Sequence, residues 1–202
     1  MTEDDARAWV RDRYGVSRET LLAAFVSRLR EEAGRQNLIA PSTLEQIWTR
    51  HIVDSAQLLG AAPDKGLWLD IGSGAGLPGM VIAMLRDEPI ELVEPRKLRT
   101  DFLARAATEL ELSNVAIHTA RIERTAGPAA VISARAVASL DALFRIAAHR
   151  STSSTVWVLP KGRNAQSEVE EARRNWHGSF HVEPSITAPD SLIVVAREVR
   201  PR

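Results

Sequence analysis

The sequence predicts an α/β fold in which a helical N-terminal extension precedes a doubly wound, mostly parallel sheet. The first sixty of the 202 residues carry apolar side chains at helical spacing. From residue 67 onward, short apolar runs alternate with helical stretches, as they do in Rossmann-like sheets. The glycine-rich segment DIGSGAGLPG, residues 70–79, joins the first run to the next helix, which is where such sheets bind ligands.

The composition excludes several classes of protein. The chain has no cysteine, which rules out a disulfide scaffold, a Cys-ligated metal site and a cysteine nucleophile. No apolar run approaches the roughly 18 residues of a membrane span. The first residues are acidic and polar, whereas a signal peptide begins basic and then turns apolar. We therefore expect a soluble protein of the reducing cytoplasm.

Residues 1–62 are predicted to form a helical segment that packs on the sheet domain, residues 63–202. Ser17 is suited to cap a helix that runs from about residue 18 to 33. Ser42 and Glu45 match the capping-box pattern and predict the start of a second helix.

Seven apolar runs predict the strands of the sheet, at residues 67–71, 90–94, 115–119, 129–134, 155–160, 180–186 and 192–197. Between them, helical spacing predicts helices at about residues 97–111, 141–149 and 165–176. Only a short TAPDS turn separates the last two strands. The last strand is therefore expected to pair antiparallel at one edge of the sheet.

The glycine-rich segment permits a dinucleotide-binding interpretation. Its glycines allow a tight turn and a close approach of ligand to backbone. Gly74, Gly76 and Gly79 satisfy the GxGxxG pattern, and Glu94 ends the next strand, where a carboxylate accepts from a ribose hydroxyl. An NAD-dependent oxidoreductase is therefore one hypothesis.

A longer pattern, Asp70-Gly72-Gly74-Gly76, resembles motif I of the class I S-adenosylmethionine (SAM) methyltransferases. In that motif the acidic residue at the strand end receives the methionine part of the cofactor. Glu94 suits the ribose of SAM as well as that of NAD. A nicotinamide enzyme also needs a substrate domain and a proton relay, and the sequence offers no clear candidate for either. SAM is therefore the favoured cofactor.

Six segments carry a more specific resemblance: RQNLIA, RHIVDSAQLL, LDIGSGAGLPG, LVEPRKLRTDFLARAATELELSNV, ISARAVASL and PKG. From about Gln36 to Gly162 they resemble, in order and spacing, the small bacterial family called RsmG or GidB. Its members are SAM-dependent 16S rRNA guanine-N7 methyltransferases. The chain departs from the family where Pro95 follows Glu94, because the family commonly has Asp followed by Ser there.

This resemblance implies a class I methyltransferase fold that uses SAM and releases S-adenosyl-L-homocysteine. The product is 7-methylguanosine, at position 527 in the family's rRNA numbering. Carried over to this sequence, the cofactor contacts fall on Gly72, Leu77, Ile122, Glu123 and Arg135, to which the glycine motif and the ribose argument add Asp70, Gly74 and Glu94.

The target atom decides which residues the chemistry needs. Guanine N7 carries a free lone pair at neutral pH, so transfer needs alignment of the reactants and no general base. Arg135 and Lys161 are candidates to orient the base through O6 or to neutralise phosphates. His51 and Asp54 have the spacing of a catalytic pair, but a hydrogen-bonded helix position is the favoured interpretation of His51.

The formal net charge of +0 hides an uneven distribution of charge. Residues 64–94 hold two basic and six acidic side chains, whereas residues 96–163 hold eleven basic and five acidic ones. The carboxyl ends of parallel strands share one edge of a sheet, where ligands bind. We therefore expect RNA contacts from basic residues that follow the predicted strands, namely Arg96, Lys97, Arg121, Arg124, Lys161 and Arg163.

The expected partner is 16S rRNA or an assembling small-subunit particle. We expect a monomer that needs neither a metal ion nor a membrane. A remaining alternative from another class is a module that binds SAM or a nucleotide together with RNA, without turnover.

Overall fold

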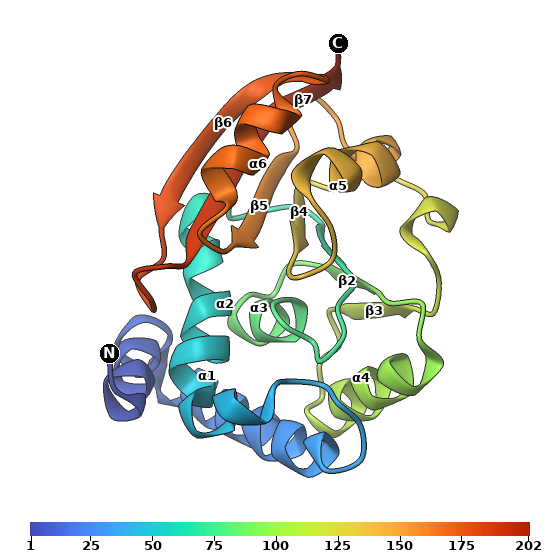
Figure 1. The fold of residues 1–202 in the computed structure, drawn as a ribbon. Helices are drawn as coiled ribbons and strands as arrows, with labels where there is room; N and C mark the ends of the chain where they lie inside the picture. The colour runs from blue at the N-terminus through green and yellow to red at the C-terminus, as the bar shows by residue number, and fades with distance from the viewer.

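Seven strands form a single sheet in the computed structural model, which describes residues 1–202. The strands are β1 Trp68–Ile71, β2 Ile90–Val93, β3 Val115–His118, β4 Val131–Ala134, β5 Val156–Lys161, β6 Trp176–Pro184 and β7 Leu192–Pro201. Their order across the sheet is β3-β2-β1-β4-β5-β7-β6 (Figure 1). The first five strands are parallel, and β7 runs antiparallel to both of its neighbours. The predicted doubly wound sheet with an antiparallel last strand is confirmed.

The helices lie on the two faces of the sheet. They are α1 Glu3–Ala33, α2 Asp54–Ala56, α3 Gly79–Leu85, α4 Lys97–Glu109, α5 Leu140–Ala147 and α6 Ala165–Ala172. Short 3₁₀ or π segments cover Pro41–Gln46, Trp48–Val53, Gln57–Ala61, Ile122–Arg124 and Ala148–Arg150. No helix has the length and apolar character that a membrane span requires.

Two hydrophobic clusters form the core, one on each face of the sheet. Alternation along β1 shows the division, because Trp68 belongs to one cluster and Leu69 and Ile71 to the other. The first cluster joins apolar residues of α1 and of the turns at 47–58 to α3, α4 and the sheet. The second joins α5, α6 and β6 to the opposite face.

The N-terminal helix begins earlier than its sequence pattern predicts. Thr2 and Asp5 form a reciprocal capping box, so α1 starts at Glu3, and Ser17 lies inside it. The helix is broken at Gly15, whose φ of 85° and ψ of 165° are not helical. The predicted cap at Ser17 is therefore wrong, because the second half of α1 begins directly after this kink, at Val16, whereas its end at Ala33 is as predicted.

The predicted capping box at Ser42 is also wrong. The first turn there is a 3₁₀ helix without a side-chain cap, and the hydroxyl of Thr43 donates to the carbonyl of Ala40. The next residues, Trp48–Val53, form a π turn. Glu3 of α1 caps this turn from a distance, because its carboxylate accepts from the backbone N–H groups of Trp48 and Thr49, both at 2.9 Å.

The predicted helix at 165–176 ends earlier than expected. Helix α6 stops at Ala172, and Trp176 begins β6. The indole of Trp176 donates to Asp141 and packs against Phe144 with a centroid distance of 5.6 Å. These contacts with α5 place Trp176 in the second core cluster.

Candidate functional site

The glycine-rich loop connects β1 to α3 and requires glycine for two physical reasons. Gly72, Gly74 and Gly76 have φ values of 69°, 53° and 84°, in the left-handed region. A Cβ on Gly72 would lie 2.6 Å from Cγ2 of Val137. The loop therefore needs glycine both for its backbone conformation and for the close approach of the segment that follows β4.

A cleft of about 480 Å³, hereafter the glycine-loop cleft, opens beside this loop. Six residues that the sequence proposed as functional line it, namely Gly72, Gly74, Leu77, Glu94, Arg96 and Arg135. The structure thus brings together residues that come from the ends of β1, β2 and β4.

Glu94 is the buried carboxylate of this cleft, with an exposed fraction of 3%. Its Oε1 accepts from the backbone N–H of Arg96, and its Oε2 accepts from the N–H of Gly74 at 3.1 Å. Arg99 lies 3.7 Å from the same Oε2. Because each carboxylate oxygen has two acceptor positions, Glu94 is held in place and keeps capacity for a hydroxyl donor.

Asp70 lies behind the loop and does not line the cleft. The hydroxyl of Ser133 donates to its Oδ1 at 2.7 Å, and the N–H of Gly79 donates to its Oδ2 at 3.2 Å. Complete burial raises the pKa of Asp70 to about 6, although these hydrogen bonds oppose the rise. In this structure Asp70 caps the start of α3 and joins it to β4.

Ile122 and Glu123 lie in the turn after β3, outside the lining of the cleft. Ile122 is 4% exposed and belongs to the core cluster of α5, whereas the side chain of Glu123 is exposed. The structure therefore does not bring these two residues together with the glycine loop in one cavity.

A second cavity of similar size, about 480 Å³, adjoins the glycine-loop cleft. The two share Arg135, Ala136 and Val137, the segment that follows β4. Ala136 has a φ of 55°, which is uncommon for a residue with a side chain. This segment is therefore a partition with one cavity on each side.

Lys161, at the end of β5, lines the second cavity. Its ammonium donates to the carbonyl of Ala138 at 2.6 Å and to Oε2 of Glu168 at 2.8 Å. The third N–H of the ammonium is left without a protein partner. Glu168 also accepts from the backbone N–H of Leu140, so it fixes both Lys161 and the start of α5.

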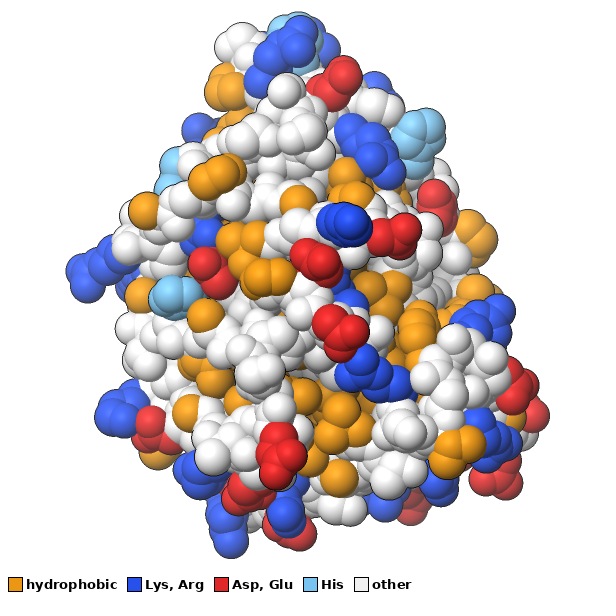
Figure 2. Space-filling view, turned by 180° about the vertical axis from the view of Figure 1, so that it is seen from behind, with side chains coloured by type: hydrophobic (Ala, Val, Ile, Leu, Met, Phe, Trp, Pro, Cys, Tyr) orange, Lys and Arg blue, Asp and Glu red, His pale blue; other side chains and the backbone are white.

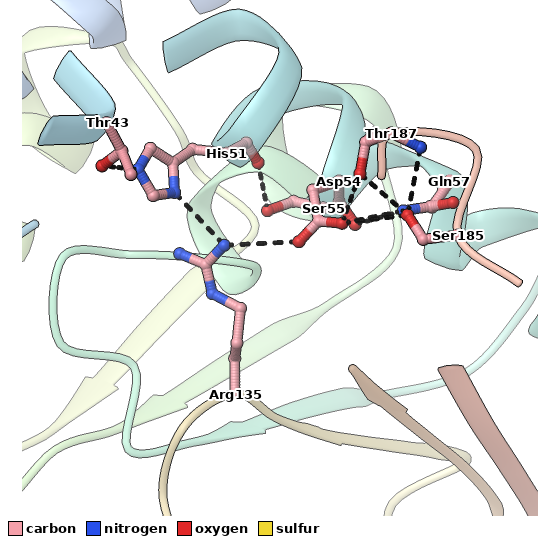
Figure 3. Close-up of polar contacts among 8 residues, drawn as sticks. All are labelled: Thr43, His51, Asp54, Ser55, Gln57, Arg135, Ser185 and Thr187. Carbon is pink, nitrogen blue, oxygen red and sulfur yellow. Dashed lines mark hydrogen bonds and ion pairs between the residues drawn. The ribbon is translucent and has the colours of Figure 1, made fainter. Parts of the chain in front are cut away.

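Arg135 is the charged residue of the partition, and its side chain is 21% exposed. Its Nη1 lies 3.3 Å from Nδ1 of His51 and 3.5 Å from Oδ2 of Asp54, as Figure 3 shows. Arg135 is therefore a partly buried, paired arginine, and its partners come from the π turn and from α2.

His51 is a neutral side chain in this arrangement. Burial, followed by the positive charges of Arg135 and Arg50, lowers its pKa to about 4. Because Arg135 can only donate, Nδ1 of His51 must accept, and Nε2–H then donates to Oγ1 of Thr43 at 2.8 Å. These contacts assign one tautomer to the ring.

The other basic residues predicted to contact RNA lie on the surface with few partners. Lys97 pairs with Asp101 at 2.7 Å, and Arg163 lies 4.0 Å from Asp190. Arg121 and Arg124 are exposed. On the face turned away from the view of Figure 1, basic and acidic side chains are interspersed, and no area of one sign dominates (Figure 2).

Sequence reasoning missed two acidic residues of the site. Glu168 stands in the polar segment QSEVEEARR, which is typical of a solvated helix face, yet it lines the second cavity. Asp54 was noted only for its spacing from His51, and it too lines this cavity. The one available signal was that Asp54 belongs to the RHIVDS segment of the family resemblance.

Solved structures of low sequence identity share the fold. A SAM dependent methyltransferase from Aquifex aeolicus superposes with a TM-score of 0.61 at 12% identity, covering 86% of this chain and 98% of that one. The protein DhpI, solved as a complex with SAH, gives a TM-score of 0.58 at 13% identity, covering 90% and 96%. The class I methyltransferase fold that the sequence predicts is confirmed.

Sequence comparisons identify the family. The sequence model of GidB, rRNA small subunit methyltransferase G, matches residues 18–190. The chain is 48% identical over 204 residues to Ribosomal RNA small subunit methyltransferase G of Novosphingobium aromaticivorans, covering 98% of this chain and 89% of that protein. It is also 48% identical over 209 residues to the protein of that name from Rhizorhabdus wittichii, covering 100% and 95%. The chain therefore belongs to the GidB family of small-subunit rRNA methyltransferases, as the sequence resemblance predicted.

Proposed function

We propose that the protein transfers a methyl group from SAM to N7 of a guanine in 16S rRNA. The observation that carries this proposal is the pair of adjoining cavities, one beside the glycine loop and one beyond Arg135. Methyl transfer needs the acceptor nitrogen in line and in contact with the sulfonium methyl, and the two cavities meet at the segment 135–137, where reactants from both can approach each other.

The residues of the glycine-loop cleft fit SAM. Glu94 is a buried, fixed carboxylate that can accept from ribose hydroxyls. It comes directly after β2, which pairs with β1, and it therefore lies beside the glycine loop that follows β1. Leu38 and Leu77 add apolar lining on which an adenine ring can pack. When bound, SAM supplies an electrophilic methyl group on a sulfonium.

The residues beyond the partition fit a purine base. Arg135 and Lys161 are cations with unpaired N–H groups beside the second cavity, and guanine O6 or a phosphate oxygen can accept from them. Because N7 already has its lone pair, these side chains only have to orient the base and exclude competing positions. Guanine N7 carries no proton that a base would have to remove, so the reaction does not need His51 as a base. Both ring nitrogens of the neutral His51 are already paired within the protein.

We further propose that residues 1–62 and 63–202 form one catalytic unit that acts as a cytoplasmic monomer on 16S rRNA or an assembling subunit. The N-terminal segment contributes to both cavities, which supports a single catalytic unit. Asp54 lines the second cavity, Leu38 lines the glycine-loop cleft, and His51 contacts Arg135 between them. The exposed Arg96, Lys97, Arg121, Arg124 and Arg163 are proposed to meet RNA phosphates.

The test is transfer of tritium from labelled SAM to 16S rRNA or to small subunits from a strain that lacks the gene. We expect the label in a single guanine. We also expect the RNA to be cleaved at that guanine under the conditions that cleave RNA at 7-methylguanosine. Gly72→Trp is the control, because even a Cβ there lies 2.6 Å from Val137. Incorporation no higher than this control would contradict the proposal and favour a binding module without turnover.

A further inference from the structure

The guanidinium of Arg135 is held by one of its three nitrogens. Nη1 contacts both His51 and Asp54, whereas Nε and Nη2 have no acceptor within the protein (Figure 3). Neither of these two nitrogens is a buried unsatisfied atom, so both keep access to solvent, and the side chain that carries them lines both cavities. Nε–H and one N–H of Nη2 point the same way and together form a two-donor edge.

Asp54 divides its carboxylate between two parts of the fold. Its Oδ2 faces Arg135, while its Oδ1 accepts from Gln57 at 3.0 Å and from the hydroxyls of Thr187 and Ser185 at 2.9 Å and 3.3 Å. Gln57 in turn donates to Ser185 and accepts from the backbone N–H of Ile186. Figure 3 shows this network extending from the helical segment to the loop between β6 and β7.

The loop between β6 and β7 is a wall of the second cavity. Ser185 and Ser191, at its two ends, line the cavity together with Asp54 and Arg135. Asp54 is thus the one side chain that joins the cavity's wall, the N-terminal segment and the partition. If its carboxylate turned away, Arg135 would lose its anionic partner and the loop would lose two hydrogen bonds.

We propose that Asp54 is a positioning residue for methyl transfer, which holds Nη1 of Arg135 so that its free Nε–Nη2 edge meets an acceptor oxygen of the target nucleotide. This inference rests on the proposed function. Long arginine side chains lose much rotamer freedom when they are fixed, and the fixed anchor removes that loss from the reaction step. His51 adds the second acceptor for Nη1 and carries no competing charge.

A double-mutant cycle tests this role. Asp54→Asn keeps the size of the side chain and removes its charge. Single-turnover rates at saturating SAM and rRNA, with enzyme in excess, keep slow variants measurable. We expect Asp54→Asn to lower the rate about tenfold or more in the natural background and less than about twofold in an Arg135→Ala background.

Two further variants separate positioning from stability. Asp141→Asn is the matched control, because Asp141 also gives one oxygen to an arginine, Arg145, and the other to two side-chain donors, and it lines neither cavity. We expect it to lower the melting temperature without changing the rate. Thr187→Val removes one hydrogen bond from Oδ1 of Asp54 and should cause a smaller loss of rate, about threefold, that also vanishes without Arg135.

The outcomes are distinguishable. Equal losses from Asp54→Asn with and without Arg135, or an unchanged rate in Asp54→Asn, would overturn the positioning role while leaving the proposed function intact. If Asp54→Asn does not fold, Thr187→Val decides by the same cycle. Absence of transfer by the natural protein would overturn the proposed function, and this inference with it.

Discussion

At the residue scale, burial shifts the pKa values of His51 and Asp70 so that the two residues have opposite effects on how the free energy of unfolding depends on pH. Burial and two nearby arginines lower the pKa of His51 from 6.5 to about 4. The unfolded chain then binds a proton that the folded protein refuses, so His51 costs stability as the pH falls from 6.5 to 4. Burial raises the pKa of Asp70 from 3.8 to about 6. The folded protein then retains a proton that the unfolded chain has lost, so Asp70 costs stability as the pH rises from 4 to 6.

Without the Asp70 carboxyl, the free energy of unfolding should therefore rise with pH between about 4 and 6.5, because only the effect of His51 remains. In Asp70→Asn, the free energy of unfolding relative to the natural protein should rise by about 2 kcal/mol between pH 4.5 and 6.5, since each pH unit is worth about 1.4 kcal/mol per proton. Urea unfolding across this range measures the difference. His51→Gln should show the opposite trend, and parallel profiles for all three proteins would contradict both assignments.

Site residues that are placed by their position after a strand are predictable from sequence, whereas those placed by contacts with distant parts of the chain are not. Gly72, Gly74 and Glu94 were predictable because they follow strands, and the ends of parallel strands share one edge of the sheet. Asp54 depends on Ser185 and Thr187, more than a hundred residues later, which no local pattern encodes. Whether Asp70 would face the cleft or the helix behind it depends on packing between α3 and the sheet.

At the element scale, the start of helix α3 is the most tightly fitted junction of the site. A Cβ on Gly79 would lie 2.2 Å from Cδ2 of Leu92 and 2.8 Å from Oδ2 of Asp70. This close approach lets the first N–H of the helix reach the carboxylate. Gly79 is therefore required by packing between helix and strand. Its φ is not positive, so backbone conformation alone does not require glycine there.

Gly79→Ala should lower the free energy of unfolding by about 2–3 kcal/mol through overpacking. The matched control is Gly60→Ala, since nothing lies within 4 Å of a Cβ there and its φ is not positive. That variant should be neutral or more stable by up to about 1 kcal/mol. Chemical denaturation compares the two, and equal effects would contradict this account of the junction.

Strands β1 and β4 were predicted well, because fully buried runs between polar segments leave little choice of element, whereas β6 has alternating burial and begins four residues before its predicted start at residue 180. The helical start was predicted less well. Thr2 and Asp5 form their capping box in a segment whose polar composition concealed the helix, and the π turn at Trp48–Val53 depends on Glu3, a partner forty-five residues away. Helix propensity gives no measure of such a distant cap.

At the scale of the whole molecule, the N-terminal segment is part of the main core. Apolar side chains from Ala6 to Leu58 share one cluster with α3, α4 and the sheet. Ion pairs fasten the same interface, including Arg18 with Asp87 at 2.6 Å and Arg105 with Glu32 at 3.0 Å. Without this segment, one face of the sheet and its helices would be open to water.

Deletion of residues 1–62 should therefore prevent cooperative folding of the remainder. We expect the full chain to unfold in a single calorimetric transition, and the fragment 63–202 to bind a hydrophobic dye and show no transition. A fragment that melts sharply and binds SAM would show instead that the segment is a separable appendage.

The π turn at Trp48–Val53 has a consequence for how this chain can change in length. Deleting one residue there would restore an ordinary helical ladder, and the segments on either side would keep nearly their present orientation, because a π turn fits one extra residue into a turn of helix. Loss of Ile52 or Val53 would, however, place His51 and Asp54 two positions apart on the helix, where they could no longer both face Arg135. A deletion at Ile52 or Val53, of a kind that surface loops tolerate, is thus incompatible with this site, and a gap in an alignment at these two positions would mark a protein with a differently built site.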